Sequence, residues 1–111
     1  MVWIKTHTGD GILNDKTIER IYSEPPRNLN KSFEFYAFVN QKSWLIYAVN
    51  VPREISNSAK DKTITDELSP KIIEMEDKIL EKLMSFILKA KENEVVDLSE
   101  KFSQSNFFNN D

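Results

Sequence analysis

The sequence predicts an α+β domain in which about five antiparallel strands form one bent sheet or small open barrel, followed by a long C-terminal amphipathic helix. Two observations carry this prediction. The first fifty residues contain short β-prone runs separated by turn residues, whereas residues 70–92 repeat their apolar positions with the period of an α-helix. A pleckstrin-homology-like arrangement, with strands followed by a C-terminal helix, has this order of elements.

The length and composition fit a single domain. The chain has 111 residues, of which 40% are hydrophobic and 30% are charged, as expected for a folded chain with one core. We therefore expect one domain over residues 1–102, with its strands within residues 2–50, and a flexible tail over residues 103–111.

Three short strands are predicted in the N-terminal part of the chain. Residues 2–6 are rich in apolar side chains, and residues 8–11 supply turn chemistry before Ile12 and Leu13. A second turn precedes a strand over residues 17–22. The two prolines at 25 and 26 have no backbone N–H to donate, so we expect a surface loop there.

The strongest β signal is a hairpin. Residues 33–39 and 43–49 are both rich in aromatic and aliphatic side chains, and the three polar residues 40–42 join them. Both runs carry apolar side chains on both faces, so both faces need cover. Sheet curvature, the helix or a second subunit would provide it.

The second half of the chain begins with a loop and continues with the helix. Residues 51–69 are mostly polar and are predicted to form a long loop, which indicates either a functional segment or disorder. Ser69 is the expected N-cap and Pro70 the first helical residue. The helix is expected to run over residues 70–92, and residues 95–102 form a short helix or an extended segment.

The helix carries two apolar stripes. Their combined arc is about 220°, whereas a helix that lies on one sheet needs roughly 100°. Either one domain wraps the helix deeply, or the second stripe meets another protein or a second copy of this chain. Glu76 interrupts the arc and either marks its rim or meets a cation. The first stripe comprises Ile72, Met75, Ile79, Leu83, Phe86 and Ala90, and the second comprises Ile73, Leu80, Met84 and Leu88.

Two adjacent phenylalanines near the C-terminus, Phe107 and Phe108, are costly to leave in water and are expected to dock on the body or on a partner, unless the tail is disordered. The candidate partner interface is therefore Ile73, Leu80, Met84, Leu88, Phe107 and Phe108.

The scarce residue types exclude many kinds of site. The chain has no Cys, one His (His7) and two Gly, which excludes disulfides, zinc ribbons, iron–sulfur clusters and sites that need two imidazoles. We predict no catalytic residue, no metal ligand and no cofactor. His7 is interpreted as an exposed turn residue, although the members of a Ser–His–Asp arrangement need not be adjacent in sequence. The carboxylates Asp10, Asp15, Glu19 and Glu24 match no metal-binding loop.

The charge balance argues against nucleic acid as a partner. The net charge is −3, and Lys42 is the only basic residue between Phe33 and Val49, so the aromatic residues are interpreted as core and cross-strand packing rather than a stacking platform. Neither a signal peptide nor a membrane span is predicted, so we expect a soluble cytoplasmic protein without membrane contact.

The opening strand Trp3-Ile4-Lys5-Thr6, the run over residues 18–22, the hairpin and the amphipathic helix resemble a group of short uncharacterised proteins of low-GC Gram-positive bacteria and their phages. These proteins typically begin with a Trp-Ile-x-Ser/Thr strand. The resemblance covers residues 2–50 and, more loosely, the helix, and it implies no activity.

The sequence thus predicts a non-enzymatic bacterial or phage protein–protein interaction module, homodimeric through its helix; an inhibitor of a host system is one concrete form. The alternative is a small-molecule or nucleotide binder that uses the concave sheet face, with residues 51–69 as a lid. An enzyme is the third class.

Overall fold

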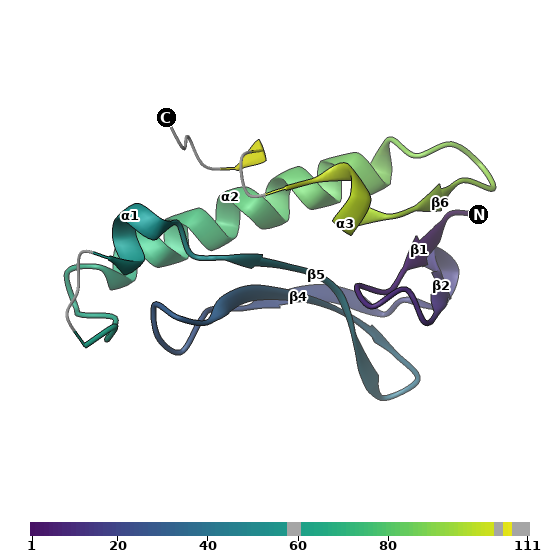
Figure 1. Cartoon of the computed structure of the whole chain (residues 1–111). Coiled ribbons are helices and arrows are strands. Elements are labelled where there is room, and N and C mark those ends of the chain that lie inside the picture. The colour runs from purple at the N-terminus through teal and green to yellow at the C-terminus, as the bar shows by residue number, and fades with distance from the viewer. Residues whose placement is uncertain (58–60, 104–105, 108–111) are drawn as a thin grey trace.

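Two three-stranded sheets and one long helix make up the fold (Figure 1). The structure is a computed structural model, and it describes residues 1–57, 61–103 and 106–107. The predicted α+β class is confirmed, whereas a single bent sheet of about five strands is wrong. The elements are β1 (Trp3–Lys5), β2 (Ile12–Asn14), the 3-10 turn η1 (Asp15–Thr17), β3 (Arg20–Glu24), β4 (Ser32–Val39), β5 (Lys42–Asn50), α1 (Arg53–Ser56), α2 (Ser69–Leu88), β6 (Val95–Val96) and α3 (Leu98–Lys101).

The sheet divides in two because η1 turns the chain between β2 and β3. The Asn14 side chain accepts a hydrogen bond from the Lys16 backbone N–H at 2.9 Å and so caps this turn. β1 pairs antiparallel with β2, and its other edge is taken by β6, which runs parallel to it. The second sheet has the order β3–β4–β5. Since β6 and α3 follow the long helix, the pleckstrin-homology-like order is not confirmed.

The predicted β4–β5 hairpin is present, with a tighter turn than expected. Val39 pairs directly with Lys42, so the connection has two residues and not the predicted three. Asn40 and Gln41 have φ values of 50° and 64°. Positive φ at both central residues is the backbone of a type I′ turn, whose twist matches that of the paired strands.

The long helix begins and ends earlier than predicted. Its N-cap is Leu68, and Ser69 is the first helical residue; the Thr65 hydroxyl accepts a hydrogen bond from the Leu68 N–H at 3.2 Å. The helix stops at Leu88 instead of 92, and the chain then runs on to the N-terminal segment. The Asn93 N–H donates to the Met1 carbonyl at 2.7 Å, which positions the following residues to form β6.

The predicted loop over residues 51–69 is not irregular throughout, because it contains α1, whose Ile55 is buried. The short segment over residues 95–102 contains both predicted forms, since β6 is extended and α3 is helical. The predicted tail over residues 103–111 lies in part outside the described residues.

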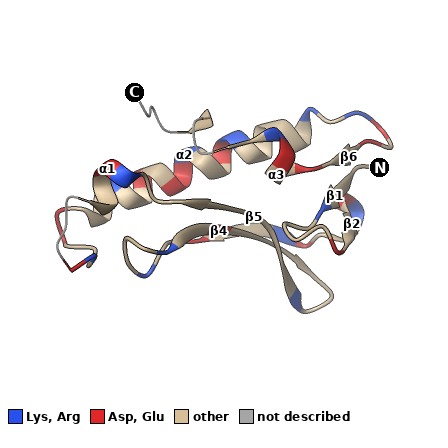
Figure 2. Ribbon diagram, viewed as in Figure 1, with Lys and Arg blue, Asp and Glu red and all other residues tan. Residues whose placement is uncertain are grey.

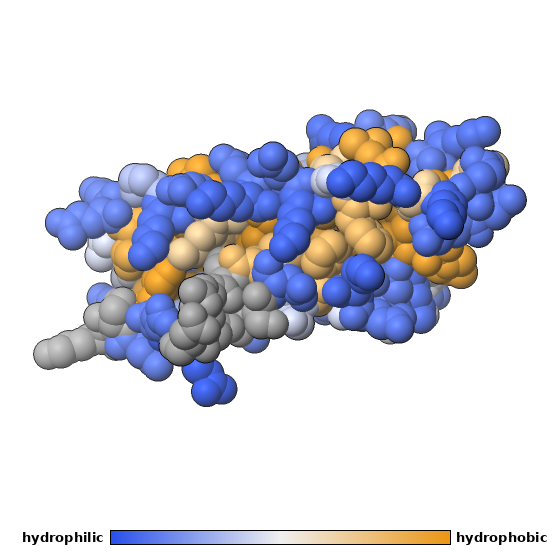
Figure 3. All heavy atoms as spheres, turned by 90° about the horizontal axis from the view of Figure 1, so that it is seen from above, coloured by the Kyte–Doolittle hydropathy of each residue, from blue (hydrophilic) through white to orange (hydrophobic). Residues whose placement is uncertain are grey.

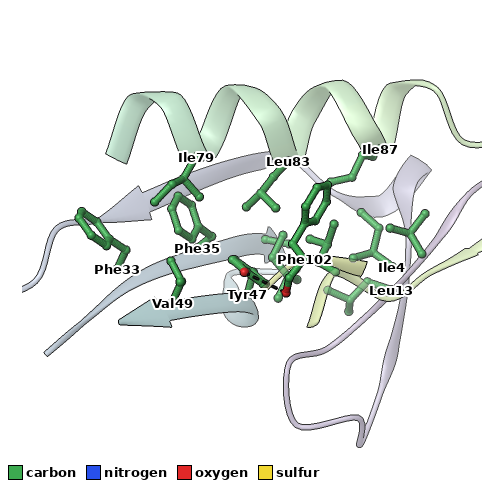
Figure 4. Packing of buried hydrophobic residues seen from close by; sticks show 14 of the residues in the cluster. Ile4, Leu13, Phe33, Phe35, Tyr47, Val49, Ile79, Leu83, Ile87 and Phe102 are labelled. Atoms are coloured by element: carbon green, nitrogen blue, oxygen red, sulfur yellow. Dashed lines mark hydrogen bonds between the residues drawn. The ribbon is translucent and has the colours of Figure 1, made fainter. Parts of the chain in front are cut away.

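The core lies between α2 and one face of the β3–β4–β5 sheet, and the β2–β1–β6 sheet closes one end (Figures 1 and 4). Figure 4 shows Ile79, Leu83 and Ile87 of α2 pointing toward the strands. Phe33 and Phe35 of β4 are fully buried in this layer. The other face of the same sheet has no helix or strand over it within the described part of the chain.

Candidate interaction surface

The two apolar stripes of α2 have different environments. Ile72 and Ile79 of the first stripe are 2% and 1% exposed, whereas Ile73 and Leu88 of the second are 50% and 79% exposed. Seen from above, hydrophilic side chains cover much of the long helix, and hydrophobic atoms reach the surface beside them (Figure 3). The first stripe is therefore core, and the second stripe is covered only in part.

The middle of the second stripe is half-buried. Leu80 packs against the core cluster, and Met84 is of intermediate exposure without belonging to that cluster. Ile87, which lies between the two stripes on the helical projection, is buried. The rest of the chain thus covers a wider arc of α2 than a flat sheet would, but it leaves Ile73 half-exposed and Leu88 mostly exposed.

Glu76 lies on the side of α2 that faces β3, which also places the second stripe there. Its carboxylate accepts a hydrogen bond from the Ser23 hydroxyl of β3, and the Oε2 atom is buried without a hydrogen-bond partner. Burial raises the pKa of Glu76 above 4.5, the charge of Asp77 adds to the rise, and the Ser23 hydrogen bond opposes it. Residues 73, 76, 80 and 84 follow one helical row. Glu76 therefore lies inside the apolar arc, between the two stripes, with part of its carboxylate buried beside β3.

β3 is the terminal strand of its sheet. The order is β3–β4–β5, so within the described ranges one edge of β3 pairs with no strand, and we call it the β3 edge. Ile21 and Ser23 pair with Ala37 and Phe35, which places them on the face beneath α2. The β3 edge and the second stripe therefore border the same side of the molecule. No sequence pattern marks this edge, because the order of strands in a sheet is set by tertiary structure.

The open face of the same sheet carries aromatic side chains. Tyr22 stacks on Tyr36 with ring centroids 5.5 Å apart, and the Arg20 guanidinium carbon lies 4.7 Å from the Phe38 centroid. The rings of Tyr22, Tyr36 and Phe38 are half-buried and do not belong to the core cluster. The predicted cross-strand packing is therefore present, whereas the prediction that these three side chains belong to the core is wrong. Burial, together with the charges of Glu34 and Glu24, raises the pKa of Tyr36 to about 12. Figure 2 shows few charged residues along the β4–β5 hairpin.

Phe107 docks on the body of the protein. Its ring lies 5.9 Å from Tyr47 and 5.4 Å from Phe102, with the Lys82 ammonium 5.5 Å from its centroid. It is half-buried there and packs on the core cluster, which is one of the two positions expected for it. Phe108 lies outside the described residues.

His7 is not the exposed turn residue that the sequence predicts. It is half-buried, and its Nδ1 lies 2.7 Å from the Ser99 Oγ at the start of α3. Its backbone N–H donates to the Leu45 carbonyl at 2.9 Å. These bonds tie the β1–β2 turn to β5 and α3. Ser99 is exposed, and no carboxylate hydrogen bond to His7 is present among the described residues, so the pair lacks the third group of a catalytic triad.

Two of the four carboxylates singled out in the N-terminal part of the sequence, Asp10 and Asp15, accept hydrogen bonds. Asp10 accepts from the hydroxyls of Thr6 and Thr8 at 2.8 and 2.6 Å, which lower its pKa, and Asp15 accepts from the Val2 N–H at 3.1 Å. Among the residues that the structure describes, no group of three or more His, Asp or Glu is arranged to hold a metal ion.

The face of the sheet beneath α2 is filled by core side chains, but residues from the predicted lid line a cavity elsewhere. Ile55 of α1, with Met75 and Phe107, forms the apolar part of a cavity of about 370 Å³ against α2. Its charged lining residues are Lys71, Lys78, Lys82 and Glu54.

None of the helices in the described ranges combines the length and apolarity that crossing a bilayer requires. Comparison with protein-family models, with curated protein sequences and with solved structures finds no match for this chain. Function is therefore inferred from the geometry of the chain itself.

Proposed function

We propose that this protein is a non-enzymatic protein–protein interaction module that self-associates through the second stripe of α2. The observation that carries the proposal is the exposure of Ile73 and Leu88 on the stripe that also contains Met84. Burying an aliphatic side chain is favourable by about 0.8 kcal/mol of free energy for each methylene group removed from water. A row of them along one helix favours a protein partner over solvent.

The open face of the β3–β4–β5 sheet supports the same class of function. Tyr22, Tyr36 and Phe38 remain half-exposed on a face that no described helix or strand covers. Tyrosine and arginine are enriched in protein interfaces, because they combine a large apolar area with hydrogen-bonding groups. A host protein bound by a bacterial or phage module is one form of this proposal.

The test is analytical ultracentrifugation of the whole chain from about 1 to 100 μM. The wild type is expected to change from monomer to dimer over this range. Ile73→Glu with Met84→Glu is expected to keep the protein monomeric throughout. We choose these positions over Leu80, because Leu80 packs against the core and its substitution would also weaken the fold.

A control pair changes the charge equally on the opposite face of the same helix. Ser85→Glu with Lys89→Gln also makes the protein two charges more negative, and both side chains are exposed. This control should dimerise like the wild type. A wild type that is monomeric at 100 μM, or a control as monomeric as the test pair, contradicts self-association through the second stripe.

The second candidate is a binder of small anions, which the cavity between α1 and α2 favours. Its apolar residues and its three lysines, which outnumber the single carboxylate of Glu54 in the lining, suit a ligand with a negative group and an apolar body. A thermal-shift screen of nucleotides and aliphatic carboxylates tests it, since a ligand that binds only the folded state raises the midpoint of unfolding. A shift that Lys78→Ala does not reduce would place the ligand elsewhere.

A further inference from the structure

The β3 edge has a self-complementary sequence. Its five residues are Arg20, Ile21, Tyr22, Ser23 and Glu24. If a second copy pairs antiparallel with this strand and the two-fold axis passes beside Tyr22, Arg20 of each copy stands opposite Glu24 of the other. Ile21 then stands opposite Ser23. The charges that end the strand are thus opposite in sign and equally spaced about its centre.

We infer that two copies of this chain join their β3 edges in this register to form one continuous six-stranded sheet. The inference rests on the proposed self-association and names the strand through which it occurs. A two-fold axis makes each contact occur twice, so one Arg–Glu match supplies two ion pairs. Directly opposed residues of antiparallel strands have Cβ atoms about 5 Å apart, within reach of a charged pair.

The side chains of β3 leave its edge open. The Tyr22 ring leans inward, since it stacks on Tyr36 and its hydroxyl lies 2.5 Å from the Ser43 Oγ of β5. Arg20 is exposed and rests over the Tyr22 and Phe38 rings, with its guanidinium carbon 5.3 and 4.7 Å from their centroids. A guanidinium held over aromatic rings keeps its N–H groups available for a carboxylate. Glu24 is exposed at the other end of the strand.

The same two-fold axis brings the second stripes of the two α2 helices toward each other. Glu76 and Ser23 place this side of α2 above β3, so Ile73 and Met84 of each copy face the axis. Strand pairing satisfies the backbone groups of the β3 edge, and the two helices add apolar contact above it. One symmetric arrangement then covers both exposed features.

Charged residues on an edge strand can instead prevent pairing. Protection needs only charge, whereas Arg20 and Glu24 carry opposite signs at equal distances from Tyr22. The two explanations differ in what a charge exchange does, so variants at these two positions separate them.

The experiment compares Arg20→Glu, Glu24→Arg and the double variant by analytical ultracentrifugation. Each single variant replaces two attractive pairs with two repulsive ones, so the dissociation constant is expected to rise roughly 10- to 100-fold. The double variant restores opposite charges and should return to within about threefold of the wild type. Unfolding midpoints of all three monomers should lie within a few degrees of one another, because both side chains are exposed and the contact of Arg20 with the Tyr22 and Phe38 rings is worth only about 1 kcal/mol.

Amide hydrogen exchange gives an independent readout. Protection of the backbone between residues 20 and 24 is expected to increase with protein concentration in the wild type and in the double variant, but not in the single variants. If the wild type dimerises and Ile73→Glu with Met84→Glu abolishes the dimer while the single charge variants do not weaken it, the β3 register is wrong and the helix surface stands. A wild type without dimer at 100 μM contradicts both.

Discussion

Ile79 and Ile73 provide a matched test of how α2 is divided, because the same substitution removes the same three carbons from each stripe. Ile79 is 1% exposed and Ile73 is 50% exposed. At about 0.8 kcal/mol for each buried methylene, with about 1 kcal/mol more for the cavity left behind, Ile79→Ala should cost roughly 3 kcal/mol of unfolding free energy. The better helix propensity of Ala returns only a few tenths of this.

Ile73→Ala should cost less than about 1 kcal/mol in the monomer, because half of its side chain is already in water and no closed cavity results. Urea unfolding followed by circular dichroism at about 1 μM measures both variants. With a slope near 1.5 kcal/mol/M, Ile79→Ala should lower the midpoint by about 2 M and Ile73→Ala by about 0.7 M or less. Equal losses from the two variants would refute the assignment of one stripe to the core and the other to a partner.

Glu76→Gln should stabilise the protein at neutral pH, because burial raises the pKa of Glu76 in the folded state above 4.5 and its charged form is therefore unfavourable there. The wild type should become more stable as pH falls through this folded-state pKa, so the difference in unfolding free energy between wild type and variant should vanish below pH 4.5. A constant difference in urea unfolding from pH 4 to 8 would contradict this. Tyr36 and Tyr47 should ionise at about pH 12, and the pKa of Tyr47 is raised by burial. Tyr47→Phe should therefore remove one late step from the phenolate titration, and it should lower the free energy of unfolding by about 1 kcal/mol because the hydrogen bond to the Phe102 carbonyl is lost. A variant that keeps both late steps would refute this assignment. Gln41→Gly should raise the free energy of unfolding by about 0.5–1 kcal/mol, because Gly adopts the observed φ of 64° without strain. A lower unfolding midpoint in this variant would show instead that the Gln41 side chain contributes to the hairpin.

The elements that the sequence predicted best are those whose stabilising contacts are local. The hairpin runs over residues 33–39 and 43–49 fall within β4 and β5, and the helical period over residues 70–92 gave all of α2 except its first residue. β6 has two residues and exists only because β1 offers it an edge, so no local pattern marks it. The segment after Leu88 likewise depends on a distant contact, since the bond from the Asn93 N–H to the Met1 carbonyl joins residues far apart in the chain.

The candidate interface shows the same division. The helical period identified both stripes of α2, but the period is equal for a stripe under a sheet and a stripe in solvent, so it could not say that Ile72 would be buried and Ile73 half-exposed. The docking of Phe107 on Tyr47 depends on a fold that brings residues sixty positions apart together. The bond between His7 and Ser99 likewise joins the first turn to the last helix.

The α+β class, the hairpin, the helix and its two apolar stripes follow from local sequence patterns, because side-chain periodicity and turn chemistry act between residues close in the chain. Three features arise only in the folded chain: the strands divide into two sheets, β3 is the terminal strand of one of them, and the second stripe of α2 lies beside this edge. These features depend on pairings between distant segments, whose free energy is gained only when the whole chain folds. The charge pattern of residues 20–24 was present in the sequence throughout, but it became informative only once β3 had a free edge.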